Sequence, residues 1–174
     1  NYIHYPGTLI TAQGSYYLER FEKKMNSNPM YGRVEIVNLD STLAKPNSVD
    51  AVLTFRNLHN WLGLEMDSIF RNSFIALKPG GLFGVVEHRA KPGTDIEKMK
   101  SSGYVTEGHA IEVALKYGFE LVAKSEINAN PKDTKDYPKG VWTLPPRLRL
   151  DDVDRDKYKS IGESDRMTLL FRKP

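Results

Sequence analysis

Residues that can donate or accept protons follow two apolar segments of the chain. The first segment, residues 51–55, leads into four residues with chemically capable or aromatic side chains: Arg56, Asn57, His59 and Trp61. The second, residues 81–86, ends in Glu87 and His88. A carboxylate beside an imidazole suits the removal of a proton from a hydroxyl or an amine, and an arginine suits an anionic group. We therefore expect Glu87, His88 and His59 to be catalytic.

Each of these residues also has a structural interpretation. The loop after residue 55 could be held by its own hydrogen bonds, with Trp61 packed on the following helix. Neighbouring side chains of a strand point to opposite faces, so we expect only one of Glu87 and His88 in a cleft. Glu87 is the better candidate, with Arg89 as its salt-bridge partner. A metal site at the two histidines and Glu87 has no recognised spacing and no third ligand set by pattern, so we predict no metal.

The elements that must position these residues alternate between strand and helix. Pro79 sets the end of the central helix, and we expect Ser15 and Thr106 to cap two others. Residues 91–102 are expected to form a loop with one helical turn. The predicted strands cover 7–12, 33–39, 51–55, 81–87, 119–127 and 166–172, and the predicted helices cover 15–25, 66–77 and 106–117.

This alternation predicts one α/β domain over residues 1–174, with a mostly parallel sheet and helices on both faces. The last two strands lack a helical crossover and should form an antiparallel pair. Ligands bind at the carboxyl ends of strands in such sheets. The residues after 55 and the residues at 87–89 should therefore line one cleft, with a Pro-Gly-Gly turn at residues 79–81 between the helix and the second strand.

A long polar segment with several prolines, residues 128–165, separates the last two strands. Loops of this length in compact domains are usually functional or disordered. We expect it to close over a substrate as a lid, with Asn128 and Trp142 contacting that substrate. The alternative is a surface wrap in which Trp142 fills a gap in the core.

Composition excludes several classes of protein. The net charge is +3 and the chain has no cysteine, so disulfides, thiolate nucleophiles and zinc–thiolate sites are ruled out. Acidic and basic residues are mixed rather than clustered, which argues against a nucleic-acid partner, and no apolar run is long enough for a membrane span. Oligomeric state is left open, a homodimer included. Cytoplasmic location is the default, although the chain opens at Asn1 and a removed leader would allow export.

Seven segments together resemble one protein family. They are Val49-Asp-Ala-Val52, Phe55-Arg-Asn-Leu-His-Asn-Trp61, Leu77-Lys-Pro-Gly-Gly81, Gly84-Val-Val-Glu-His-Arg89, Ser125-Glu-Ile-Asn-Ala-Asn-Pro-Lys-Asp133, Gly140-Val-Trp-Thr-Leu-Pro-Pro146 and Gly162-Glu-Ser-Asp-Arg-Met-Thr168. They are similar to class I S-adenosylmethionine-dependent methyltransferases, in particular to bacterial proteins described as predicted methyltransferases. The resemblance implies a three-layer Rossmann-like sheet, S-adenosylmethionine as cofactor and methyl transfer to a small-molecule acceptor.

The resemblance also suggests residues that hold the cofactor and the acceptor. Ala12 and Gln13 occupy the place of an acid that grips the ribose, and Asp40 that of an acid near the adenine. Phe55 and Arg56 are expected to line the cofactor, with an anionic substrate as the alternative partner of Arg56. The substrate side is expected to include Asn57, Trp61, Asn128 and Trp142.

The first strand and the glycine-rich loop of the family are not found in this sequence. Two alternatives therefore stay open. One is a non-catalytic binding module, and the other is a different nucleotide enzyme such as a nicotinamide-dependent dehydrogenase. The dehydrogenase would need a Gly-x-Gly-x-x-Gly turn, which is also missing.

Overall fold

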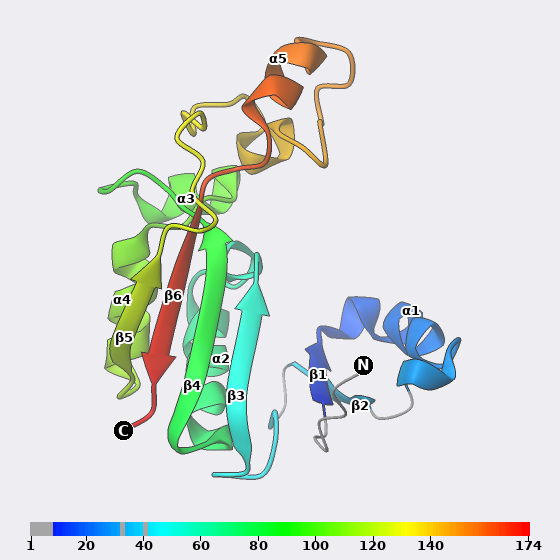
Figure 1. The fold of residues 1–174 in the computed structure, drawn as a ribbon, viewed down its shortest axis with the longest axis vertical. Coiled ribbons are helices and arrows are strands. Elements are labelled where there is room, and N and C mark those ends of the chain that lie inside the picture. Colours follow the sequence, from blue (N-terminus) through cyan, green and yellow to red (C-terminus); the bar gives the residue numbers. More distant parts are fainter. Residues whose placement is uncertain (1–8, 32–33, 40–41) are drawn as a thin grey trace.

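A computed structural model describes residues 9–31, 34–39 and 42–174, and these contain two separate β-sheets (Figure 1). The smaller sheet is a parallel pair, β1 (Leu9–Gln13) and β2 (Val34–Asn38). The larger sheet has the order β3-β4-β6-β5. Its strands are β3 (Val49–Phe55), β4 (Leu77–His88), β5 (Glu120–Ser125) and β6 (Arg166–Arg172).

The directions of the strands confirm the predicted mixture. β3 and β4 run parallel, whereas β6 pairs antiparallel with both β4 and β5. β6 therefore lies between β4 and β5, and the segment just before it returns to the carboxyl end of β4. This placement brings residues 163–166 to the end of the strand that carries Glu87 and His88.

The described helices are α1 (Ser15–Met25), α2 (Leu64–Ala76), α3 (Ile96–Ser102), α4 (Glu107–Lys116) and α5 (Arg155–Ile161), with 3-10 turns η1 (Pro29–Tyr31), η2 (Leu58–Asn60) and η3 (Gly140–Thr143). Helices α1, α2 and α4 lie close to their predicted positions, whereas α3 extends what was predicted as one helical turn and α5 lies in the segment predicted as a long loop. Thr106 caps α4 as predicted, because its hydroxyl accepts a hydrogen bond from the backbone N–H of His109. The predicted cap at Ser15 is wrong, since α1 already begins at that residue and Gly14 holds the cap position.

The core lies between one face of the larger sheet and helices α2 and α4. Aromatic rings carry much of it: Phe83 of β4 meets Phe70 of α2 edge-on at 5.0 Å, and Phe119 lies 5.2 Å from Phe83. Along β4, Phe83, Val85 and Glu87 are buried, as the two-residue period of a strand requires. Glu87 is therefore the last residue in a row that otherwise faces the apolar core.

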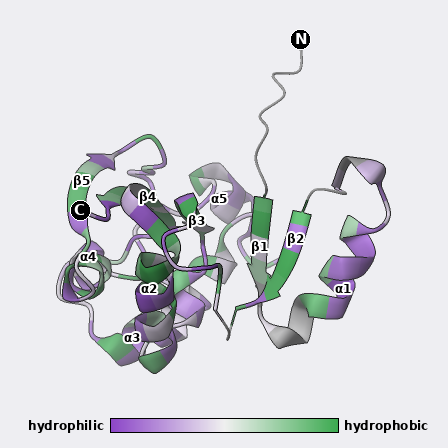
Figure 2. Cartoon of the chain, turned by 90° about the horizontal axis from the view of Figure 1, so that it is seen from below, coloured by the Kyte–Doolittle hydropathy of each residue, from purple (hydrophilic) through white to green (hydrophobic). Residues whose placement is uncertain are grey.

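The opposite face of the larger sheet is more exposed. Leu53 and Phe55 of β3 have 62% and 57% of their surface accessible. The β1–β2 pair lies on the β3 side of the sheet, with α1 beyond it, and most of β1 and β2 is hydrophobic in colour (Figures 1 and 2). His88, next to Glu87 in the strand, belongs to this second face.

The Pro-Gly-Gly segment differs from its predicted role. It lies inside β4 rather than in a turn before it, at the point where the register between β3 and β4 shifts. Gly81 is required there, because an added Cβ would come within 2.8 Å of the Lys78 carbonyl oxygen. Among the described residues, no helix combines the length and apolar character needed to cross a bilayer.

Candidate functional site

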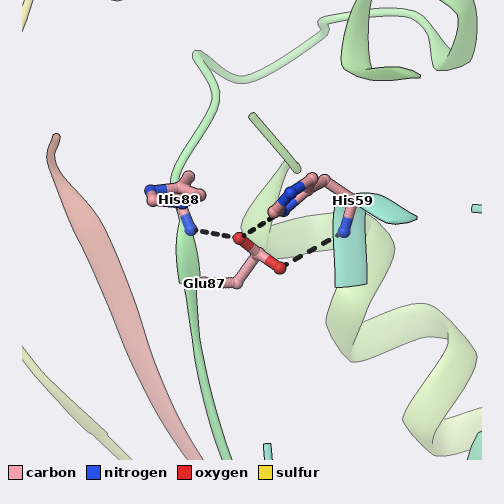
Figure 3. Close-up of side chains that lie close together, drawn as sticks. All are labelled: His59, Glu87 and His88. Atoms are coloured by element: carbon pink, nitrogen blue, oxygen red, sulfur yellow. Dashed lines mark hydrogen bonds and ion pairs between the residues drawn. The ribbon is translucent and has the colours of Figure 1, made fainter. Parts of the chain in front are cut away.

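The ends of β3 and β4 bring His59 and Glu87 into contact (Figure 3). Leu58, fully buried, anchors the 3-10 turn η2 to the core and so directs His59 toward β4. The Nδ1 atom of His59 lies 3.1 Å from Oε1 of Glu87, and the backbone N–H of His59 donates to Oε2 at 3.2 Å. Two contacts to one carboxylate fix the imidazole relative to the strand, so two of the three residues predicted to be catalytic lie in contact.

Glu87 is fully buried and has a third donor, the backbone N–H of His88, at 2.7 Å from Oε1. Within the described residues its one ion-pair partner is His59. The predicted salt bridge to Arg89 is therefore wrong. Arg89 instead donates to Asp165 and Glu126. It lies just past the end of β4, where it faces Glu126, the residue after β5, and Asp165, the residue before β6.

His88 points away from Glu87 and meets Ser164. Its Nδ1 atom lies 2.5 Å from the Ser164 hydroxyl oxygen. Burial lowers the pKa of His88 to about 4; the negative charge of Glu87 opposes this shift, and Arg56 and Arg166 add to it. The imidazole of His88 is consequently neutral near pH 7.

Arg56 follows β3 with a backbone conformation that is unusual for arginine. Its φ is 58°, in the left-handed region, and its N–H donates to the Val86 carbonyl at 2.7 Å. Such a conformation costs about 1 kcal/mol for a non-glycine residue and is often retained at functional sites. The side chain of Arg56 is exposed, as is the ring of the preceding residue, Phe55.

Buried polar contacts attach the insertion to the end of the larger sheet. Asp165 accepts hydrogen bonds from Arg89 at 2.9 and 3.0 Å and pairs with Lys135 at 2.9 Å. Asp133 accepts from the Tyr104 hydroxyl at 3.0 Å and from the Asp165 backbone N–H at 2.7 Å. We call these five residues the clamp.

Burial and contacts within the clamp shift the pKa values of Asp165 and Tyr104. Burial opposes ionisation of Asp165, but hydrogen bonds from Arg89, Lys135 and the backbone of Asn130 outweigh it and lower the pKa to about 2. Burial, reinforced by the charge of Asp133, raises the pKa of Tyr104 far above its usual value. Asp165 is therefore ionised and the Tyr104 phenol is neutral over the ordinary pH range.

The insertion places Trp142 against the site. The indole ring lies edge-on to the His59 ring at 5.9 Å between centroids, and Arg149 stacks on the indole at 4.8 Å. Asn128 lies elsewhere, where its amide donates to the Thr168 hydroxyl of β6 at 2.9 Å. Of the two predicted lid residues, Trp142 thus contacts the His59 group and Asn128 is bonded to the sheet.

The remaining predicted site residues that the structure describes do not join the contact between His59 and Glu87. Trp61 packs against the apolar core rather than against His59, and Asn57 precedes η2 with an exposed side chain. Ala12 and the backbone of Gln13 belong to β1, in the smaller sheet. The Gln13 side chain and Asp40 lie outside the described residues.

A metal-binding geometry also results from this arrangement. His59, Glu87 and His88 offer donor atoms that all lie within 4.8 Å of one another. These are the three residues that the sequence analysis considered for a metal and set aside, because their spacing matches no recognised pattern; the fold brings them together from two strand ends. Both Nδ1 atoms already contact protein partners, Glu87 and Ser164, so a metal would have to replace hydrogen bonds or use the Nε2 atoms.

Sequence reasoning missed Ser164, Arg166 and the clamp carboxylates. One signal was available: a polar run at residues 163–166 directly precedes the last strand. In an antiparallel partner of β4, that run must lie beside Glu87 and His88. The register confirms this, because Arg166 pairs with His88.

Comparison with known proteins gives agreement in structure but not in sequence. No protein-family model matches the chain, and no curated protein sequence matches it either. Among solved structures, the cyclase SpnF superimposes with a TM-score of 0.64 at 17% identity, over 96% of this chain and 66% of its own. The chain thus spans slightly less than two thirds of that protein.

Two methyltransferase structures match similarly. Geranyl diphosphate C-methyltransferase from Streptomyces coelicolor gives a TM-score of 0.63 at 10% identity, over 98% of this chain and 64% of its own. A methyltransferase from Methanosarcina mazei that depends on S-adenosylmethionine gives 0.61 at 12% identity, over 95% of this chain and 82% of its own. The chain therefore has the Rossmann-like α/β fold of class I S-adenosylmethionine-dependent methyltransferases.

Proposed function

We propose that this protein transfers a methyl group from S-adenosylmethionine to a small-molecule acceptor, with His59 as general base and Glu87 as the residue that orients it. The contact between His59 Nδ1 and Glu87 Oε1 at 3.1 Å, in a buried position at two adjacent strand ends, carries the proposal. Structural neighbours that methylate geranyl diphosphate support a small acceptor.

The proton chemistry follows from the contacts of Glu87. An ionised carboxylate accepts the Nδ1–H of His59, which leaves the lone pair on Nε2. Nε2 can then take the proton from an acceptor O–H or N–H while that atom forms its bond to the methyl carbon. Glu87 stabilises the resulting imidazolium, as a carboxylate does in other histidine-based catalytic groups. His88, held neutral, would donate or accept a hydrogen bond beside it.

When bound, the cofactor supplies a methyl group that is attached to a sulfonium sulfur. After the methyl group is transferred, the remainder of the cofactor leaves as a neutral thioether. The described residues fit part of such a molecule. Phe55 exposes its ring at the end of β3, where an apolar nucleoside face can pack, and Ala12 lies near the end of β1. Gln13 and Asp40 complete the proposed cofactor residues.

The first test is binding. S-adenosylhomocysteine should raise the melting temperature of the protein, since a ligand that binds only the folded state stabilises it by RT ln(1 + [L]/Kd). Calorimetry with the same compound should give a saturable signal. No binding at millimolar concentration would contradict the enzyme and would favour the non-catalytic module.

The second test is the base. His59→Gln and Glu87→Gln should each lower kcat about 10²–10⁴-fold with an acceptor that must lose a proton, while circular dichroism stays native. His109→Gln is the matched control, because His109 lies on α4 and is not among the described hydrogen-bond donors to Glu87, so kcat should stay unchanged. If His59→Gln retains full kcat, His59 is not the base.

A further inference from the structure

We propose that the acceptor carries a carboxylate or phosphate group, which Arg56 and Arg166 bind on either side of His88. This inference builds on the proposed function and names the chemical class of its acceptor. The three residues lie at the ends of three neighbouring strands, with Arg56 just past β3, His88 at the end of β4 and Arg166 at the start of β6.

The order β3-β4-β6 places the three residues in a row, side by side at the strand ends, and the charges of both Arg56 and Arg166 act on His88. The backbone N–H of Arg56, just past β3, donates to Val86 of β4, two residues before His88. On the other side of β4, Arg166 pairs directly with His88 in the antiparallel register. Directly paired residues project from the same face of a sheet, so His88 and Arg166 share the face opposite the aromatic core.

Charges around this row are unbalanced. Within the described part of the chain, Arg56 has no ion-pair partner, and Arg166 has one, the exposed Glu163 at 2.5 Å. Glu87 points to the core side and contacts His59. A neutral His88 between two guanidinium groups adds donors or acceptors but no negative charge. The row therefore has a net positive charge that an anion would balance.

Three further observations favour a ligand over solvated arginines. The Nε atom of Arg166 is buried and has no hydrogen-bond partner among the described residues, which is uncommon for a charged group. Arg56 is held in the left-handed region immediately after β3. Arg149, stacked on Trp142 beside His59, adds a third guanidinium from the insertion. Arginine suits carboxylate and phosphate because its donors match two oxygens at once.

The experiment measures binding of inorganic phosphate and of acetate to the intact protein, without cofactor and without turnover. Histidine ring signals are followed by nuclear magnetic resonance at low ionic strength. We expect saturable shifts of the His88 signals. Arg56→Gln and Arg166→Gln should each weaken binding about tenfold, since each removes charge-assisted hydrogen bonds. Arg166→Lys should lie between Arg166→Gln and wild type.

Arg71→Gln is the control, because Arg71 is exposed on α2, and it should leave anion binding within twofold of wild type. Equal loss in the control and the site variants, or no saturable shift in wild type, would overturn the proposal.

A second arm separates the acceptor from the carboxylate of the cofactor. The affinity of S-adenosylhomocysteine for Arg56→Gln and Arg166→Gln should stay within twofold of wild type. A tenfold loss of that affinity would assign the two arginines to the cofactor and overturn the inference about the acceptor. Phosphate binding is measured without cofactor, so it can be observed even if the protein transfers no methyl group. Conversely, methyl transfer can be observed even if phosphate does not bind.

Discussion

Apolar contacts hold α2 and α4 on the larger sheet, whereas hydrogen bonds and ion pairs hold the insertion at the end of the same sheet. The first region contains a run of aromatic rings from Phe70 to Phe119. The second depends on Asp133 and Asp165, both nearly fully buried and both bonded to charged or hydroxyl groups. Hydrophobic burial has no preferred direction, while a hydrogen bond fixes distance and angle.

The comparison explains why the site lies where it does. The aromatic core fixes β3 and β4 side by side and so decides that His59 reaches Glu87. The clamp decides where Trp142 and Ser164 lie relative to the two histidines. Substitutions in the aromatic core should therefore change mainly the stability of the domain, and substitutions in the clamp should change mainly the geometry of the site.

Phe83→Ala should have the largest effect. The ring is fully buried between α2 and β6, and its removal leaves a cavity, so we expect a loss of about 3–5 kcal/mol in the free energy of unfolding. Urea titration followed by circular dichroism measures it. Leu64→Ala is the control, because Leu64 is 85% exposed and its change should be near zero. Similar values for both variants would mean that the core does not carry the domain.

Asp165→Asn should have a smaller and more local effect. It weakens the contacts to Arg89 and Lys135 but leaves Arg89 its partner Glu126, so we expect a loss of about 1–3 kcal/mol. Hydrogen exchange should rise in residues 128–165 well before it rises in β4. Uniform exchange over both regions would show that the insertion and the sheet unfold as one unit.

The clamp should also make stability depend on pH. The pKa of Asp165 is about 2 in the folded protein and near 3.8 in the unfolded chain, so the unfolded chain binds the proton more readily. This contribution to stability is present above about pH 4 and is lost as the pH falls toward 2. Between about pH 2 and pH 4, the free energy of unfolding should depend less steeply on pH for Asp165→Asn than for wild type. An unchanged slope would remove Asp165 as the titrating group.

Glu120→Gln should have the smallest effect. Glu120 pairs with Arg172 at 2.7 Å on the surface, and both side chains are about half exposed. Exposed pairs contribute about 1 kcal/mol or less, so the free energy of unfolding should change by less than that. A loss as large as that of Asp165→Asn would contradict the distinction between buried and surface charges. Added salt should reduce any difference that remains.

The agreement between sequence and structure varies along the chain. α1, β6 and the cap at Thr106 depend on local patterns, and their positions were predictable from those patterns. Arg89 was assigned to Glu87 because the two are close in sequence, yet Asp165 is its partner. Nothing local to Arg89 indicates a carboxylate 76 positions away. α3 was predicted only as one helical turn within a loop, because its seven residues are too short for a clear helical period.

The sequence alone determined the alternation of strands and helices, the apolar faces that build the core, and the polar residues at two strand ends. These follow from periodicity and from local steric and capping preferences, which act over a few residues. Only the tertiary structure decided that Glu87 turns to His59, that His88 meets Ser164, and that Arg166 lies beside His88. Such pairings depend on strand order and register, which contacts between distant segments set.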